Sequence, residues 1–212
     1  MGTGGQQRPR PGPAPVAPVP AGAPAAIALL GTSADPPTRG HRALLEGLLR
    51  LYPAVATWAS DNPLKRHAAP LALRSALLEA LVKAIGDPRL TVEPELSSPW
   101  AMETLERARR RWPTTDVVFV VGSDLAGDIP RWRHAELWLP GCRLAIVPRQ
   151  GWPLAAEGLA RLQALGAKPE VLALEVPATA SSGIRARHEA EAVPAELWPL
   201  LLPDNPYGLA PP

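Results

Sequence analysis

From residue 27 onward, short apolar runs alternate with segments in which leucines recur at helical spacing. The apolar runs end at turn-forming residues, which predicts buried strands. Leu44, Leu45, Leu48 and Leu49 repeat with the period of one helix face, which predicts an amphipathic helix. The strands are expected at residues 27–30, 54–60, 90–95, 116–121, 142–149 and 171–176. The helices are expected at residues 41–52, 71–85, within 97–112, at 153–167 and at 181–190.

Turn and cap residues mark the ends of several of these segments. Gly86 and Gly166 end two helices, since glycine adopts the left-handed conformation that closes a helix. Ser97 or Ser98 can cap the helix within 97–112, with Pro99 in its first turn. Strands that alternate with helices predict an α/β fold, a parallel sheet with helices on both faces and right-handed crossovers.

The chain has 212 residues and is 46% hydrophobic, which is enough apolar material for one core. One domain is therefore expected, at residues 27–203, followed by a C-terminal tail at 204–212. Residues 1–26 hold seven prolines, five glycines and no aromatic residue, so we expect a disordered tail. Within it, PVAPVP could adopt polyproline II and bind an SH3-like partner, although a plain extension is the favoured interpretation.

Charge and composition exclude several classes of protein. The net charge of +2 comes from Arg8 and Arg10 in the tail, and this balance argues against a nucleic-acid-binding domain. No uncharged apolar run is long enough to span a membrane, and prolines interrupt any secretory h-region, so we expect no membrane association and no export. Cys142 is the single cysteine, which is typical of a reducing, cytoplasmic setting.

Candidate chemistry lies in the loops after three strands. Ligands of an open parallel sheet bind beyond the carboxyl ends of its strands, where the strand order reverses. Loops rich in small polar residues follow the strands there, at residues 31–41, 122–132 and 177–185. The first loop lacks the G-x-G-x-x-G fingerprint and no G-x-x-x-x-G-K-[ST] occurs, so neither a dehydrogenase nor a P-loop NTPase has motif support.

The first loop ends in Thr38, Arg39, Gly40 and His41 at the start of an expected helix. Free backbone N–H groups and the positive end of the helix dipole make such a start an anion site. A hydroxyl and an imidazole there could both point at a phosphate. Because the dipole disfavours a cationic imidazole, His41 must either face an anion or stay neutral.

The first loop does not stand alone. GTSADPPTRGH resembles the G-[GT]-[ST]-x-D-P-x-[HT]-x-G-H signature of bacterial nicotinate-nucleotide adenylyltransferases, members of the nucleotidyltransferase superfamily with the [HT]-x-G-H motif. Four later segments are similar to further motifs of that family: WASDNPLK, SSPWAMETL, VVGSDLAGDIPRW and ASSGIR. The five blocks keep the family's order from Ile27 to about Arg187, and their residues are most similar to those of the cyanobacterial branch.

This resemblance implies a Rossmann-like nucleotidyltransferase fold and an activity. Members transfer AMP from ATP to the 5′-phosphate of nicotinate mononucleotide, which forms deamido-NAD and pyrophosphate in NAD biosynthesis. The phosphate nucleophile is already ionised, so the enzyme has to position two anions and neutralise charge rather than supply a base. Mg²⁺ would bridge ATP phosphate oxygens, held by the nucleotide and water, so no dedicated protein metal site is expected.

The resemblance also implies roles for individual residues. His41 would stabilise the α-phosphate with Thr38 beside it, and Arg185 would hold the β- and γ-phosphates, so these three form the expected catalytic set. Trp132 would stack on the pyridine ring, and Lys65 would contact the mononucleotide phosphate. The expected ATP-binding residues are Gly31, Thr32, Ser33, Gly40, His41, Gly122, Asp124, Ser181, Ser182 and Arg185. The expected residues for nicotinate mononucleotide are Asn62, Lys65, Trp132 and Arg149.

Four positions depart from the family pattern, namely Ala34, Ala101, Ala180 and Gly183. They put fine substrate contacts in doubt and leave the phosphate-handling residues intact. The acceptor could also be the amide mononucleotide, phosphopantetheine, or a sugar or alditol phosphate, although the spacing from G-S-D to Trp132 and the N-P-L-K segment favour a pyridine nucleotide. A nucleotide-binding module without turnover is the alternative from another class. The sequence carries no interface signature, and the oligomeric state stays open.

Overall fold

The computed structural model describes residues 1, 23–62, 65–174, 176–177 and 181–211. Its centre is a sheet of six parallel strands in the order β3-β2-β1-β4-β5-β6. The strands are β1 Ala26–Thr32, β2 Ala54–Ala59, β3 Leu90–Val92, β4 Asp116–Gly122, β5 Arg143–Val147 and β6 Lys168–Val171. Strand order reverses between β1 and β4, which pair from Ala26 with Asp116 to Leu29 with Phe119.

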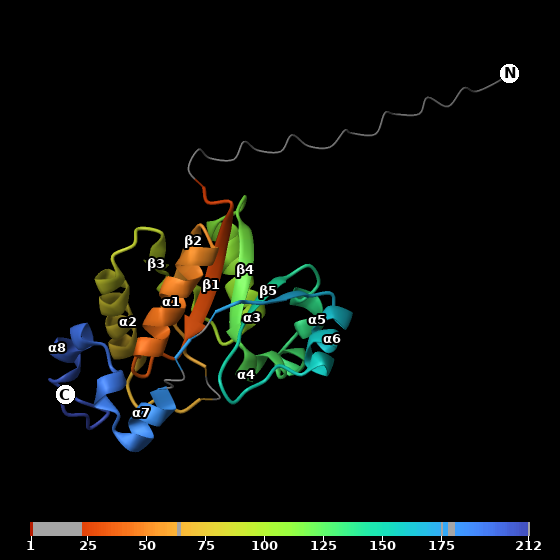
Figure 1. Cartoon of the computed structure of the whole chain (residues 1–212). Helices are drawn as coiled ribbons and strands as arrows, with labels where there is room; N and C mark the ends of the chain where they lie inside the picture. Colours follow the sequence, from red (N-terminus) through yellow and green to blue (C-terminus); the bar gives the residue numbers. More distant parts are fainter. Residues whose placement is uncertain (2–22, 63–64, 175, 178–180, 212) are drawn as a thin grey trace.

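Helices cover both faces of this sheet (Figure 1). The helices are α1 Arg39–Leu51, α2 Leu71–Ile85, α3 Ala101–Arg111, α4 Ser123–Ala126, α5 Ala135–Trp138, α6 Ala156–Ala164, α7 Ser181–Arg187 and α8 Trp198–Leu201. Short 3-10 turns lie at residues 94–96, 129–131, 190–192 and 195–197. None of the helices in the described part of the chain combines the length and the apolar character needed to cross a bilayer.

Two apolar cores lie on the two faces because successive strand residues point to opposite sides. In β1, Ala28 and Leu30 join the core under α1, α2 and α8, and Ile27 and Leu29 join the core under α3, α5 and α6. All four β1 side chains are buried. The expected α/β fold with helices on both faces of a parallel sheet is therefore confirmed.

The last strand lies earlier than its sequence pattern indicated. β6 ends at Val171, whereas we expected a strand at 171–176. Leu172 is buried and Leu174 packs on the same core, in a segment that follows the edge strand. Leu174 also lies close to α1, since a Cβ added at Gly47 would be 3.0 Å from its Cδ2. Val171 pairs with Ile146, and the Leu172 N–H still donates to the Ile146 carbonyl at 2.9 Å, so only the start of the apolar run pairs with β5. Leu174 and Val176 beyond it pack on the core, while the edge strand itself is largely exposed.

The start of α3 also differs from the expectation. The helix begins at Ala101, and its N-cap, Trp100, makes no side-chain capping bond. Ser98 Oγ instead accepts from the Trp100 N–H at 3.1 Å and donates to Glu103 at 2.7 Å. Ser98 therefore stabilises the approach to the helix, and Pro99 lies before the helix and not in its first turn.

The expected C-terminal tail is the largest correction to the domain boundaries. Tyr207 and Leu209 are buried, with 5% and 2% of their surface exposed, and both belong to the core that contains α1 and α2. Residues 204–211 therefore pack as part of the folded unit. At the other end, most of the tail expected at residues 1–26, with its PVAPVP segment, falls at residues 2–22, outside the described residues. The folded unit begins slightly before the expected residue 27, because β1 starts at Ala26.

Candidate active site

A cleft of about 1290 Å³ opens at the carboxyl ends of β1 and β4, where the strand order reverses. Its walls come from the loops after β1, β2, β4 and β5, from the start of α3 and from α7. Every residue assigned to the site from the sequence lines this cleft, with the exception of Thr38. These are Gly31, Thr32, Ser33, Gly40, His41, Asn62, Lys65, Gly122, Asp124, Trp132, Arg149, Ser181, Ser182 and Arg185.

Reciprocal hydrogen bonds fix His41 in the first turn of α1. The Thr38 hydroxyl accepts from the His41 backbone N–H at 3.3 Å, and His41 Nδ1 accepts from the Thr38 backbone N–H at 3.1 Å. This is a capping box with histidine in the place usually taken by glutamate or glutamine. Because a backbone N–H can only donate, Nδ1 is an acceptor, and the proton of the neutral ring is assigned to Nε2. Nε2–H then donates to Thr32 Oγ1 at 2.8 Å.

The imidazole is neutral near pH 7. Burial, together with the positive charge of Arg149, lowers the pKa of His41 to about 4. Of the two possibilities left by the sequence, the structure therefore selects the neutral ring. Thr38 is wholly buried, so its hydroxyl serves the capping box. Because this oxygen caps the helix and Thr38 is absent from the cleft lining, the expected contact of its hydroxyl with a phosphate stays a prediction.

The end of β4 brings a glycine and a carboxylate together. A Cβ added at Gly122 would lie 2.3 Å from Asp124 Oδ1 and 3.0 Å from Arg149 Cδ, so a larger residue here would force these side chains to move. Asp124 Oδ2 accepts from Arg149 Nη1 at 2.8 Å. Asp124 Oδ1 is buried and has no hydrogen-bond partner among the described residues. The carboxylate therefore keeps one oxygen available to a ligand hydroxyl.

Arg149 lies beside residues assigned to ATP, although the resemblance assigns it, with Lys65, to nicotinate mononucleotide. It forms an ion pair with Asp124 and acts electrostatically on His41. Its backbone N–H donates to Ser123 Oγ at 2.9 Å, and Ser123 in turn donates to the Trp152 carbonyl at 2.7 Å. These contacts fix the start of the loop after β5 against the end of β4. Arg149 thus lies next to Asp124 and His41, which the resemblance assigns to ATP, and not with the turn that holds Lys65.

The residues expected at the mononucleotide lie on two separate loops. Asn62 and Lys65 lie close together, since the Lys65 N–H donates to the Asn62 carbonyl at 3.0 Å. Trp132 follows the 3-10 turn at 129–131 and is half-buried. Its ring lies 6.2 Å from the buried ring of Trp138, centroid to centroid, at a tilt of 36°. Trp132 therefore packs on the core and lines the cleft.

α7 is fastened directly onto the first loop. Ser181 Oγ donates to the Pro36 carbonyl at 2.8 Å. Arg185 Nη1 donates to the Asp35 carbonyl and lies 3.2 Å from Asp35 Oδ2. The first and last motif blocks of the sequence thus meet at one edge of the cleft.

Asp35 is a further residue of this region that the sequence motifs did not single out. Its side chain is 1% exposed and accepts from the backbone N–H groups of Ala68 at 2.8 Å and Ala69 at 3.1 Å. The Tyr207 hydroxyl donates to it at 2.9 Å, and Arg185 completes the set. Its place in the D-P pair of the first block was a signal, but its partners are far away in the chain.

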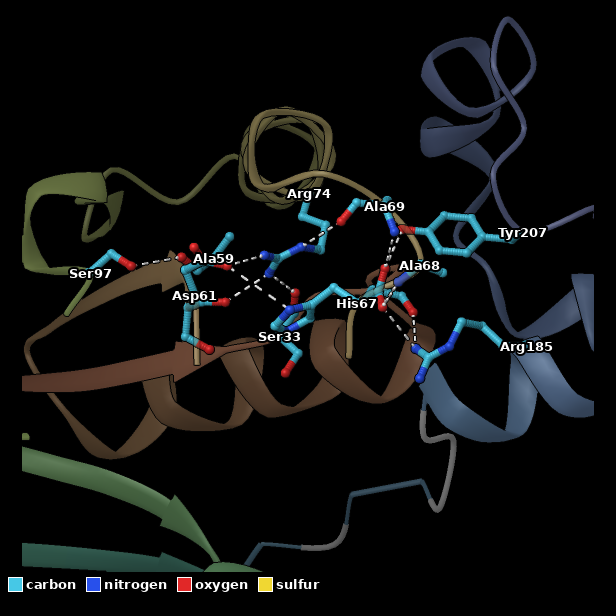
Figure 2. A network of polar contacts seen from close by, with 12 residues as sticks. Ser33, Ala59, Asp61, His67, Ala68, Ala69, Arg74, Ser97, Arg185 and Tyr207 are labelled. Atoms are coloured by element: carbon cyan, nitrogen blue, oxygen red, sulfur yellow. Dashed lines mark hydrogen bonds and ion pairs between the residues drawn. The ribbon is translucent and has the colours of Figure 1, made fainter. Parts of the chain in front are cut away.

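Arg74 was also missed. It is 1% exposed and donates to the carbonyls of Ser33 and Ser60, each at 2.8 Å, and to Asp61 Oδ1 at 3.1 Å. Figure 2 shows its side chain pointing from α2 toward Ser33 and Asp61, which lie in the loops that follow β1 and β2. The available signal was an arginine at helical spacing with Leu77, Leu78 and Leu81 on the buried face. Arg74 holds the two loops in a fixed relation.

Comparison with known proteins agrees with this architecture. The cytidylyltransferase-like family model matches residues 29–189. The chain belongs to this family. It is similar to a probable nicotinate-nucleotide adenylyltransferase of Synechocystis, with 40% identity over 150 residues, which cover 66% of this chain and 75% of that relative. A Methylorubrum extorquens protein with the same description is 33% identical over 146 residues, which cover 65% of this chain and 77% of that protein.

A solved structure shares the fold of this family member. The Plasmodium falciparum nicotinic acid mononucleotide adenylyltransferase complexed with NaAD superposes with a TM-score of 0.70. It covers 87% of this chain and 98% of its own, at 15% identity. The resemblance read from the five motif blocks, including its cyanobacterial character, is confirmed.

Proposed function

We propose that this protein transfers AMP from ATP to nicotinate mononucleotide, which forms deamido-NAD and pyrophosphate. The observation that carries the proposal is the neutral His41, whose Nε2–H lies at the start of α1 in a cleft that also holds Arg185 and Asp124. The similarity to the Synechocystis relative supports the choice of substrates.

The reaction asks for charge stabilisation and not for a base. An acceptor phosphate oxygen attacks the α-phosphorus of ATP in line, the bond to the β-phosphate oxygen breaks, and pyrophosphate leaves. His41 Nε2–H is proposed to turn from Thr32 to an α-phosphate oxygen. The free N–H groups and dipole at the start of α1 add positive potential at the same place. Thr38 keeps Nδ1 occupied as an acceptor, which keeps the proton on Nε2.

The remaining groups fit the two ends of ATP. Arg185, with Ser181 and Ser182 at the start of α7, is proposed to bind the β- and γ-phosphates. Asp124 is proposed to accept from ribose hydroxyls through its free Oδ1, and Gly122 permits the close approach. Arg149 is proposed to steady Asp124 and to add positive charge near the phosphates.

Two loops are proposed to hold the acceptor. The Lys65 ammonium, next to Asn62, would bind the mononucleotide phosphate as a point charge. Trp132 would stack on the pyridine ring while its packing on Trp138 fixes the plane of the indole.

Mg²⁺ is proposed to arrive with ATP. Phosphate oxygens and water are the ligands this cation prefers, and on the nucleotide it would neutralise charge on the departing pyrophosphate. The described residues contain no group of three or more histidine, cysteine or acidic side chains placed to hold a metal. The donor set of the cleft, in which Asp124 is proposed to bind ribose and Arg185 the phosphates, is compatible with a cation carried by the nucleotide.

The proposal is tested by incubating the full chain with ATP, Mg²⁺ and one acceptor at a time, and measuring pyrophosphate. We expect release with nicotinate mononucleotide and formation of deamido-NAD. Release only with nicotinamide mononucleotide or phosphopantetheine would move the protein to another branch of the family. Binding of ATP without release from any acceptor would identify a non-catalytic nucleotide-binding module.

A further inference from the structure

The C-terminal segment, defined here as residues 202–211, folds into a closed turn that carries Tyr207. The Asn205 side chain accepts from the Leu209 N–H at 3.0 Å and donates to the Leu209 carbonyl at 2.7 Å. The Asn205 N–H donates to the Leu201 carbonyl at 2.8 Å, which joins the turn to α8. Since Leu209 is buried in the core, the segment has its own anchor and presents Tyr207 from a fixed base.

Tyr207 reaches the carboxylate of Asp35 from this base (Figure 2). Burial, and the negative charge of Asp35, raise the pKa of Tyr207, so the phenol keeps its proton and acts as a donor. Asp35 Oδ1 accepts from Tyr207 and from the Ala69 N–H, and Oδ2 accepts from the Ala68 N–H and pairs with Arg185. Each of these donors restricts rotation of the carboxylate, which is buried and has no room to reorient freely.

Arg185 uses one end of its guanidinium on Asp35. The contacts found among the described residues are made by Nη1, to the carbonyl and to Oδ2 of Asp35. The side chain is 30% exposed and lines the cleft. Guanidinium is a planar fork, so fixing Nη1 also fixes the direction of Nη2 and Nε, which suit two phosphate oxygens.

We propose that Tyr207 is a positioning residue for nucleotide binding. Through Asp35 it fixes the guanidinium of Arg185 in the orientation that receives the terminal phosphates, so the C-terminal segment completes the ATP side of the cleft. The inference rests on the proposed role of Arg185. It assigns a site function to a segment that the sequence indicated as a tail.

The variant Tyr207→Phe tests the proposal because it removes the donor and keeps the ring in the core. We expect KM for ATP to rise about three- to tenfold, the size associated with the net loss of one hydrogen bond, because Tyr207 acts on the nucleotide only through Asp35 and Arg185. KM for the acceptor should change little. The matched control is Tyr52→Phe, the other tyrosine of the chain, which is buried in the same core at the C-cap of α1. The control should leave KM for ATP unchanged.

A second comparison separates positioning from packing. In an Arg185→Ala background, Tyr207→Phe should no longer raise KM for ATP, because the group it positions is gone. Asp35→Asn should raise KM for ATP, as Tyr207→Phe does. An equal rise from Tyr207→Phe with and without Arg185 would overturn the proposal, as would a lowered melting temperature with an unchanged KM for ATP.

Binding of inorganic tripolyphosphate, measured by calorimetry, separates this inference from the proposed reaction. Its affinity should fall in Tyr207→Phe and not in Tyr52→Phe, whatever acceptor the enzyme uses. A chain that forms no deamido-NAD but shows this loss would refute the proposed function and leave the role of Tyr207 standing. If the wild type forms deamido-NAD but Tyr207→Phe binds tripolyphosphate as tightly as the wild type, the proposed function stands and the proposed role of Tyr207 is refuted.

Discussion

His41 Nε2 and Thr32 Oγ1 lie 2.8 Å apart, and the proton between them belongs to the imidazole. The assignment follows from the opposite side of the ring, where Nδ1 accepts from the Thr38 backbone N–H. A neutral donor aimed into the cleft is thus built from the first turn of α1 and the end of β1. Five tests follow from the surroundings of this pair and from the far wall of the cleft.

His41→Ala is expected to lower kcat about a hundred- to a thousandfold, the usual effect of losing one donor to developing charge. ATP affinity should change little, because the hydrogen bond is proposed to strengthen only as charge develops on the α-phosphate. Steady-state pyrophosphate production, with a matched ATP titration, measures both quantities. An alanine variant that keeps full activity would remove His41 from the mechanism.

Thr38→Ala is expected to lower stability by about 1 kcal/mol, since the helix loses its N-cap oxygen. Its effect on kcat should be smaller than that of His41→Ala, because the buried hydroxyl does not face the cleft and the backbone N–H still holds Nδ1. Thermal melts and turnover on the two variants make the comparison. A loss of kcat in Thr38→Ala as large as that in His41→Ala would show that the hydroxyl contacts the substrate.

The pKa of His41 predicts a pH dependence of stability. Its folded value of about 4 lies below the model value of 6.5, so between these limits the unfolded chain binds more protons. The contribution of the neutral ring is present above about pH 6.5 and is lost as pH falls toward 4. Denaturant unfolding from pH 4 to 8 should therefore show a steeper decline in the wild type than in His41→Asn. Parallel curves for the two proteins would contradict the buried, neutral ring.

Arg149→Ala is expected to raise KM for ATP and to leave KM for nicotinate mononucleotide close to the wild-type value. The variant leaves Asp124 Oδ2 without its ion-pair partner and removes a positive charge that acts on His41. Loss of that charge should also raise the pKa of His41 and shift the acidic limb of the rate profile to higher pH. KM measurements for both substrates and a pH profile of kcat/KM are the test. A rise only in KM for nicotinate mononucleotide would instead show that Arg149 acts on the acceptor.

Trp132→Ala is expected to raise KM for nicotinate mononucleotide and to leave KM for ATP unchanged. The lost binding free energy should be roughly 1 to 3 kcal/mol, the size of one base stacked on an aromatic side chain. Because Trp132 also packs on Trp138, some stability should be lost. A residue of purely structural importance would instead cost about 3 to 5 kcal/mol of folding free energy and leave the acceptor KM unchanged. Trp112→Ala, a half-buried tryptophan outside the cleft lining, is the control for both readouts.

The local pattern of the sequence determined the order and type of the main elements. α2 occupies residues 71–85 and is followed by Gly86, as expected, because helix periodicity and a left-handed cap are local signals. The motif blocks likewise predicted the cleft lining, since the carboxyl ends of parallel strands share one edge of the sheet. The apolar run after residue 170 predicted a strand that continues to residue 176, whereas β6 ends at Val171. Alternating apolar residues indicate burial, and they do not distinguish a strand from a segment that packs on the core without strand pairing.

Tertiary structure decided how the site residues relate to one another. Thr38 faces its helix and not the cleft, Arg149 pairs with Asp124, and Asp35 binds both Arg185 and Tyr207. The ion pair of Arg149 and the contacts of Asp35 join segments far apart in the chain, so no local period or turn preference encodes them. The capping box of Thr38 and His41 is local, but it uses a histidine where glutamate or glutamine is usual. The charge state of His41 also depends on burial and on Arg149, which exist only once the strands are ordered. The sequence thus determined which groups are present at the cleft, and the packing of distant segments determined what each group can do there.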